Sequence, residues 1–251
     1  MTADREPENR PLRSGRTTGV IAAVMLSLIV VAGVVVVVWN LVGGAAPVSP
    51  ASTSTAKASS SAAPTVPVPA EARSGCGLPG YDTDGTLTAP PAATWKFVGV
   101  FQAPQSSTAG PGRVSADGYG SCFAHTRAGA VLAAANYIAD TFSDSLVGEM
   151  VDKAVLPGAG QQAAKDSLAS GRGSTIGTRM SLQGIRLLTY TGTGATVDAA
   201  LVADTGDMFG EVMTLVWADG DWKIQLTDTG QPQVPITQLT SLAGYLPWKA
   251  N

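Results

Sequence analysis

The sequence predicts an N-terminal transmembrane helix, a disordered linker and then an α+β domain in which helices pack on one face of a curved antiparallel sheet. Three observations predict this organisation. The stretch from Gly19 to Trp39 contains no charged residue, and a segment rich in Pro, Ser and Ala follows it. In the remaining chain, apolar side chains first recur at helical spacing and then alternate as in strands.

Residues 19–42 are interpreted as a transmembrane helix. A helix rises about 1.5 Å per residue, so the charge-free stretch reaches roughly 32 Å, the hydrocarbon thickness of a bilayer. Gly19 begins the span, and Trp39 lies where an interfacial aromatic anchor is expected. The alternative is a cleaved signal peptide with small residues at 43–45, although signal-peptide cores are usually about 7–15 residues long.

The charges around this segment predict its orientation. Residues 1–18 form a short tail that carries Arg5, Arg10, Arg13 and Arg16, and the next basic residue is Lys57. Because arginine-rich flanks stay in the cytoplasm, we expect a single-pass protein of the cell membrane with the C-terminal domain outside. Residues 43–74 then form a disordered linker, since they include five prolines and almost no large apolar residue.

Residues 75–251 are long enough for one extracytoplasmic domain. This part contains 10 basic and 15 acidic residues, a net charge near −5. Such a surface repels phosphate backbones, so nucleic acid is not an expected partner. Both cysteines, Cys76 and Cys122, lie here, and an oxidising compartment favours a disulfide between them. Two separate buried thiols are the alternative.

The first half of the domain predicts one strand and three helices. Residues 93–101 are β-rich, and a Gly/Pro/Ser-rich loop follows over 102–120. Thr126 is a suitable N-cap for a helix over 127–142, whose apolar stripe has helical spacing. Shorter helices are expected over 144–155, stopped by Pro157, and over 161–170, ended by Gly171. The stripe of the first helix consists of Val131, Ala134, Ala135, Ile138 and Phe142.

The second half predicts a four-stranded meander over 182–191, 195–204, 208–218 and 221–227. Asp219-Gly220 between the last two strands is a strong signal for a type I′ hairpin. Alternation places Met213, Leu215 and Trp217 on one face, which we expect to cover the helices. The tail beyond the last strand is predicted to be irregular because of its prolines at 232, 235 and 247.

Two parts of the sequence carry resemblances. Helices followed by a meander that ends in VMTLVWADGDWKI (212–224) resemble the cone-shaped fold of nuclear transport factor 2-like proteins. The motifs GCGLPG (75–80) and CFAHTRAGAVLAAANY (122–137), together with the single span, resemble a family of uncharacterised actinobacterial membrane proteins associated with integrative and conjugative elements. The resemblance implies the layout of inner-membrane subunits of type IV secretion and conjugation machines.

No residue set predicts a reaction, a cofactor or a metal site. His125 is the only histidine and lies at a helix entrance, where a capping or packing role is expected rather than catalysis. Residues 82–86 resemble the start of a calcium loop, but position twelve is Ala93 rather than Glu. A pocket between helices and sheet would be within reach of a few polar side chains, each of which is equally explained as a rim residue. These side chains are Tyr137, Asp140, Tyr190 and Asp198. The arginine of the loop 170–174 offers a contact for an anion, but a helix-to-strand connector is the plainer role of this loop.

These observations predict a non-enzymatic, membrane-anchored envelope protein that acts as a scaffold or assembly subunit of a conjugative-transfer or type IV secretion-like machine. Its expected partners are the membrane, other envelope proteins and further copies of itself. The alternative is a tethered cone-shaped domain that binds a small ligand or catalyses a reaction. A pocket with polar groups favours the alternative, and a filled core favours the scaffold.

Overall fold

An antiparallel sheet is the centre of the structure, a computed structural model that describes residues 73–171 and 179–250. The strands β5 (Met180–Tyr190), β6 (Gly194–Ala203), β7 (Met208–Ala218) and β8 (Asp221–Ile224) lie side by side in chain order. This arrangement confirms the predicted meander. Asp219 and Gly220 both have positive φ, 54° and 75°, as the predicted type I′ turn requires.

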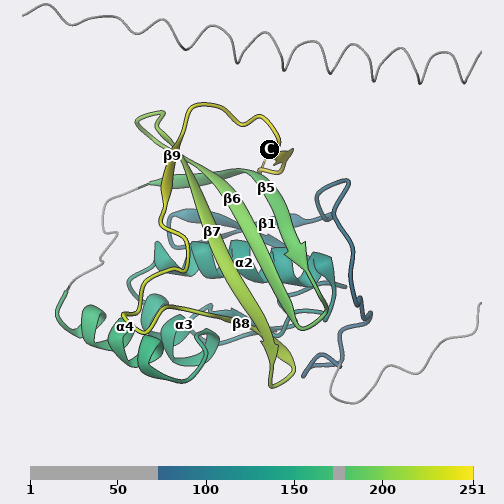
Figure 1. The fold of residues 1–251 in the computed structure, drawn as a ribbon, viewed down its shortest axis with the longest axis horizontal. Coiled ribbons are helices and arrows are strands. Elements are labelled where there is room, and N and C mark those ends of the chain that lie inside the picture. The colour runs from purple at the N-terminus through teal and green to yellow at the C-terminus, as the bar shows by residue number, and fades with distance from the viewer. Residues whose placement is uncertain (1–72, 172–178, 251) are drawn as a thin grey trace, which may run out of the picture. The chain divides into compact units, whose positions relative to one another are not determined.

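Helix α2 (Arg127–Thr141) packs across the inner face of the sheet, behind β5 to β7 in Figure 1. Thr126 is its N-cap, as predicted, and its hydroxyl accepts a hydrogen bond of 3.0 Å from the Gly129 N–H. The predicted apolar stripe is buried from Val131 to Ile138. Phe142 is half-buried just after the helix and stacks on Phe101 with ring centroids 5.6 Å apart.

Of the two further helices, the first is shorter than predicted and the second begins two residues earlier. Helix α3 is Val147–Ala154 and helix α4 is Ala159–Ala169, with Pro157 between them. Gly171 follows α4 with a φ of 69°, the left-handed conformation that ends many helices. The two helices pack against each other, and α3 also contacts β8. The described residues therefore form an α+β fold with three helices on an antiparallel sheet.

The predicted strand over 93–101 is instead a hairpin. Strands β1 (Thr94–Val98) and β2 (Phe101–Gln105) pair around Gly99 and Val100. Gly99 has a φ of 56°, which glycine adopts without steric cost, and this reverses the chain in the middle of an apolar run. The following loop contains a second small pairing, β3 (Arg113–Val114) with β4 (Gly120–Ser121).

The prediction of an irregular tail is also wrong in part. Strand β9 (Thr237–Leu239) pairs with β7, and β10 (Leu246–Pro247) pairs with β5, so the tail reaches both sides of the meander. Between them, the Tyr245 hydroxyl donates to the buried carboxylate of Asp198 on β6 at 3.0 Å. Arg186 on β5 forms an ion pair with the same carboxylate and lies 3.9 Å from the centroid of the Tyr245 ring. The tail thus covers the face of the sheet opposite to α2.

The core lies between the sheet and α2. Met213 and Leu215 are buried and Trp217 is half-buried against the core, so the predicted inner face of β7 is confirmed. Trp222, opposite Trp217 across the hairpin, is fully buried, and its indole N–H donates to the Ala124 carbonyl at 3.0 Å.

A disulfide joins Cys76 to Cys122, as predicted, with the sulfur atoms 2.10 Å apart. It fixes the N-terminal edge of the domain to the segment that precedes α2. Next to it, the Gly75 N–H donates to the Gly220 carbonyl at 2.8 Å, at the turn between β7 and β8. Gly75 therefore lies beside this turn.

No helix within the described ranges is long and apolar enough to cross a membrane. The predicted span over 19–42, with Gly19 and Trp39, lies outside these ranges, as do the four arginines of the tail and nearly all of the linker.

Candidate functional site

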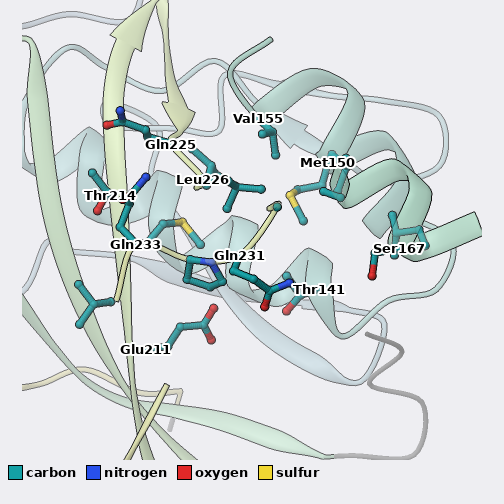
Figure 2. A pocket seen from close by; sticks show the side chains of 18 residues that line it. Thr141, Met150, Val155, Ser167, Glu211, Thr214, Gln225, Leu226, Gln231 and Gln233 are labelled. Carbon is teal, nitrogen blue, oxygen red and sulfur yellow. The ribbon is translucent and has the colours of Figure 1, made fainter. Parts of the chain in front are cut away.

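An apolar pocket with a volume of about 240 Å³ lies at the edge of β7. Helices α2, α3 and α4 form one wall, β7 forms another, and the segment after β8 closes it (Figure 2). Its polar groups are few and, with one exception, uncharged. The lining residues are Thr141, Met150, Val151, Val155, Ala164, Ser167, Leu168, Glu211, Val212, Met213, Thr214, Ile224, Gln225, Leu226 and 230–233.

The pocket exists because two strands share one edge of β7 without meeting. Strand β8 pairs with residues 215–218 of β7, and β9 pairs with residues 208–210. Residues 211–213 lie between these pairings and have no partner strand on this edge in the described part of the chain. The segment that connects β8 to β9 leaves the sheet here, and the space it leaves is the pocket.

Two glycines let the connecting segment lie close to α4. A Cβ at Gly230 would lie 2.7 Å from the Ala164 nitrogen, and a Cβ at Gly160 would lie 2.4 Å from the Thr227 carbonyl oxygen. Neither position tolerates a larger residue without movement of the backbone. The wall of the pocket is therefore held against the helix by close backbone contact.

The main chain of Val212 faces the unpaired edge. In an antiparallel strand, alternate residues direct their N–H and C=O to opposite neighbours. Thr214 accepts a hydrogen bond of 2.9 Å from the Gln225 N–H on the β8 side, whereas Trp217, of the other parity, donates to the Thr193 carbonyl at 2.9 Å on the β6 side. Val212 has the same parity as Thr214, and its polar groups point into the gap that lines the pocket.

Glu211 is the single ionisable side chain among the lining residues. It is half-buried, and no hydrogen bond or ion pair joins its carboxyl to another described residue. Burial raises the pKa of Glu211 to about 7, because the pocket solvates the ionised form poorly. Figure 2 shows its carboxyl directed toward the side of the pocket where Gln231 and Thr141 lie.

His125 has a packing role, as predicted. Its ring is stacked on Trp217 with centroids 3.7 Å apart and meets Trp222 edge-on at 5.6 Å. Its Nε2 is hydrogen-bonded to the Gly192 carbonyl. The imidazole is buried within an aromatic cluster and does not line the pocket.

The four polar side chains expected within reach of a pocket are not brought together, and none of them lines this one. The Tyr137 hydroxyl donates to the Trp222 carbonyl at 2.8 Å, and the Tyr190 hydroxyl donates to the Asp82 carbonyl at 3.2 Å. Asp198 lies on the opposite face of the sheet with Arg186. Tyr137, Tyr190 and Asp198 therefore have partners elsewhere in the domain instead of lining this pocket.

Asp140 is the least satisfied of these groups. It is 1% exposed, and its Oδ2 atom has no hydrogen-bond partner among the described residues. Burial, and to a smaller extent the charge of Glu149, raises the pKa of Asp140 to about 8. The carboxyl is therefore largely neutral in the folded domain at pH 7.

The remaining sequence motifs have structural roles or lie outside the described residues. The Asp82 carboxylate accepts hydrogen bonds of 3.0 Å from the backbone N–H and the Nε of Arg127, so it anchors the start of α2. No group of three potential metal ligands occurs within 73–171 and 179–250. The loop 170–174 is described only as far as Gly171.

Glu211 is not among the residues that the sequence singles out, although a signal for it exists. Alternation places Met213, Leu215 and Trp217 on the inner face, and two residues further back the same alternation reaches Glu211. A carboxyl at an inward-facing strand position is unusual, because charged groups are seldom buried without a partner. The pocket itself depends on where β9 returns, which the sequence does not indicate.

Comparisons with known proteins give one match. No curated protein and no solved structure matches the chain. One family model, a domain of unknown function designated DUF8175, matches residues 53–247. The match begins within the predicted linker and extends through β10, and it covers more than half of the chain. The chain therefore belongs to the DUF8175 family of domains of unknown function.

Proposed function

We propose that this chain is a non-enzymatic, single-pass membrane protein whose extracytoplasmic domain binds a small apolar ligand. The observation that carries the proposal is the pocket at the unpaired edge of β7, with apolar walls and one carboxyl inside. Ligand sites typically combine an apolar lining with a few polar groups that fix orientation. Here Glu211 and the main chain of Val212 are such groups, and three exposed, uncharged glutamines also line the pocket.

The location outside the cytoplasm is proposed from the sequence and from one feature of the fold. The charge-free segment over 19–42 and the arginines before it favour a span with its N-terminus in the cytoplasm. The disulfide between Cys76 and Cys122 suits an oxidising compartment. The linker over 43–74 then separates the domain from the membrane surface.

We further propose that the domain is a cone-shaped, nuclear transport factor 2-like fold. Its helices precede a meander that ends in the hairpin of Trp217 and Trp222, as in that superfamily. The register between β5 and β6 shifts twice, at 182–184 and at 187–189. Such bulges bend a strand and increase the twist of a sheet, which supports the curvature that a cone requires.

Binding of a neutral apolar probe to the full chain in phospholipid nanodiscs tests the proposed function. The probe is 2-(4-fluorophenyl)ethanol, observed by ¹⁹F NMR against empty nanodiscs. Ala164 lines the pocket, so Ala164→Phe fills it and is expected to abolish saturable binding. Ala169→Phe, an exposed position on the same helix, is the matched control and should bind like the wild type.

A second pocket-filling variant guards against a folding defect in the first. Val151 is buried in the pocket wall on α3, and Val151→Phe narrows the pocket from a different helix than Ala164→Phe does. Near-ultraviolet circular dichroism reports whether each variant is folded. Equal binding by the wild type and by folded pocket-filling variants contradicts the proposal.

An assembly subunit of a conjugative-transfer or type IV secretion-like machine is a second candidate function. The β1–β2 hairpin favours it, because Phe97 is 67% exposed and borders a hollow of about 150 Å³ together with the exposed Val114. Exposed apolar side chains that cluster often mark protein interfaces. Photocrosslinking from position 97 in native membranes, compared with the exposed Leu188 on β5, tests this candidate; equal yields from both positions contradict it.

A further inference from the structure

We propose that the pocket binds a small apolar molecule that carries a protonated amine, with the ammonium group paired to the Glu211 carboxylate. The inference rests on the proposed ligand-binding function and adds the chemical class of the ligand. It depends on the charge inside the pocket, the orientation of the β7 edge and the size of the cavity.

The first step is the charge. Among the described residues that line the pocket, Glu211 has no cationic neighbour, and the other lining residues are uncharged. An ionised carboxylate in an apolar cavity is costly unless a counter-charge accompanies it. A cation supplied by the ligand removes this cost, whereas a carboxylate or phosphate ligand increases it.

In the described part of the chain, charged side chains on the surrounding elements do not fill this role. On α3, Lys153 pairs with Glu149 at 2.6 Å, and Lys165 on α4 pairs with Asp152 at 2.8 Å. Three further charged side chains on these elements also lie outside the pocket lining: Asp166 on α4, Lys223 on β8 and Asp228 in the connecting segment. Glu211 is therefore the residue of the pocket whose charge a ligand can compensate.

The second step is the hydrogen-bonding capacity around Glu211. A primary ammonium group has three N–H donors, and one carboxylate does not satisfy them all. The Val212 carbonyl faces the unpaired edge next to Glu211, and the Gln231 side chain lies on the side of the pocket toward which the Glu211 carboxyl points (Figure 2). These oxygens suit the remaining donors. A divalent metal ion is a poorer fit, because it needs several anionic ligands and the pocket provides one.

The third step is the apolar body of the ligand. Met150 and Leu226 lie across the cavity from Glu211 in Figure 2. The volume of about 240 Å³ is below the usual range of about 300–1,000 Å³ for drug-sized ligands. A phenylalkyl or short branched alkyl group is of suitable size. The occupant is therefore a small aromatic or aliphatic amine rather than a lipid or an extended peptide.

A matched pair of probes tests the ligand class with the full chain in nanodiscs. The two probes are 2-(4-fluorophenyl)ethylamine and 2-(4-fluorophenyl)ethanol, which share the apolar body and differ in charge. At pH 8 we expect the amine to bind wild type at least fivefold more tightly than the alcohol. Glu211→Gln should remove this preference and leave the affinity for the alcohol within twofold.

Glu149→Gln is the matched control, because it makes the same substitution outside the pocket. It should keep the preference for the amine. Between pH 8 and pH 5.5 the wild-type affinity for the amine should fall at least fivefold, since protonation removes the charge of Glu211, while the affinity for the alcohol stays constant.

The outcomes separate this inference from the proposed function. If both probes bind equally to wild type and to Glu211→Gln, and Ala164→Phe abolishes both, the pocket binds ligands but the amine preference is wrong. If neither probe binds, or if both bind the folded pocket-filling variants unchanged, the proposed function fails and the inference fails with it.

Discussion

Asp221 organises the junction between the sheet and the segment that enters α2. Its carboxylate accepts hydrogen bonds from the backbone N–H groups of Cys122 and Phe123, at 2.7 and 2.8 Å, and from that of Trp222 at 2.9 Å. Burial raises the pKa of Asp221, and the N–H donors oppose the shift. The two carboxyls of the β7–β8 hairpin region thus differ in their surroundings. Asp221 is buried and accepts three hydrogen bonds, whereas Glu211 is half-buried and accepts none from the described residues.

Because Glu211 lacks hydrogen-bond donors, ionisation of its carboxyl destabilises the folded domain. Its pKa is about 7 in the folded domain against an ordinary value of 4.5, so the folded state holds a proton that the unfolded chain releases between these values. Stability therefore falls as pH rises through this window, by about 1–3 kcal/mol in total. Glu211→Gln should be as stable as wild type near pH 4.5 and more stable by this amount at pH 8.

Urea unfolding of both proteins at several pH values measures the difference. Asp140, whose pKa is also raised, contributes in the same direction to both proteins and cancels in the comparison. A difference that is constant between pH 4.5 and pH 8 would show that the Glu211 carboxyl is well solvated.

At the scale of elements, the β7–β8 hairpin contributes a large part of the core. Trp222 is fully buried with a hydrogen-bonded indole, whereas Trp217 is half-buried and stacked on His125. Trp222→Ala should lower the free energy of unfolding by about 3–5 kcal/mol. Trp217→Ala should lower it by about 2 kcal/mol, because less of the Trp217 surface is withdrawn from water. Urea unfolding measures these losses, and Phe97→Ala, at an exposed position, is the control with an expected loss near zero. Equal losses at the two tryptophans would contradict this assignment of burial.

The elements that the sequence predicts are those specified by local signals. Helix α2 has a cap at Thr126 and an apolar stripe, and the meander has alternation and an Asp-Gly turn. Strand β2 escapes prediction because Gly99 turns the chain inside a continuous apolar run. Strands β9 and β10 are short and mostly exposed, and they form only because distant strands offer free edges. The pocket follows from such a long-range pairing, so neither its position nor the role of Glu211 is apparent locally.

At the scale of the whole domain, both ends of the described chain are tied to the sheet. The C-terminal segment pairs with β7 and β5, and its Tyr245 covers Asp198. At the other end, Cys76 is bonded to Cys122, and Gly75 contacts the turn at Gly220. The segment from 77 to 121, which contains the β1–β2 hairpin, is thereby a closed covalent loop.

The closed covalent loop determines how the domain responds to a pulling force. When the two ends of the chain are pulled apart, tension passes from Cys76 through the disulfide to Cys122 and α2, and the loop carries none of it. The bridge spans 46 positions of sequence. At about 3.3–3.6 Å per extended residue, it withholds about 150 Å of chain from stretching. Single-molecule extension should therefore lengthen by this amount after reduction, and equal lengths would show that the bridge is absent.

Tension applied to the two ends of the described domain therefore reaches α2 and the sheet first and leaves the hairpin that carries Phe97 slack until the disulfide is reduced. The redox state of the two cysteines thus decides which parts of the domain bear load.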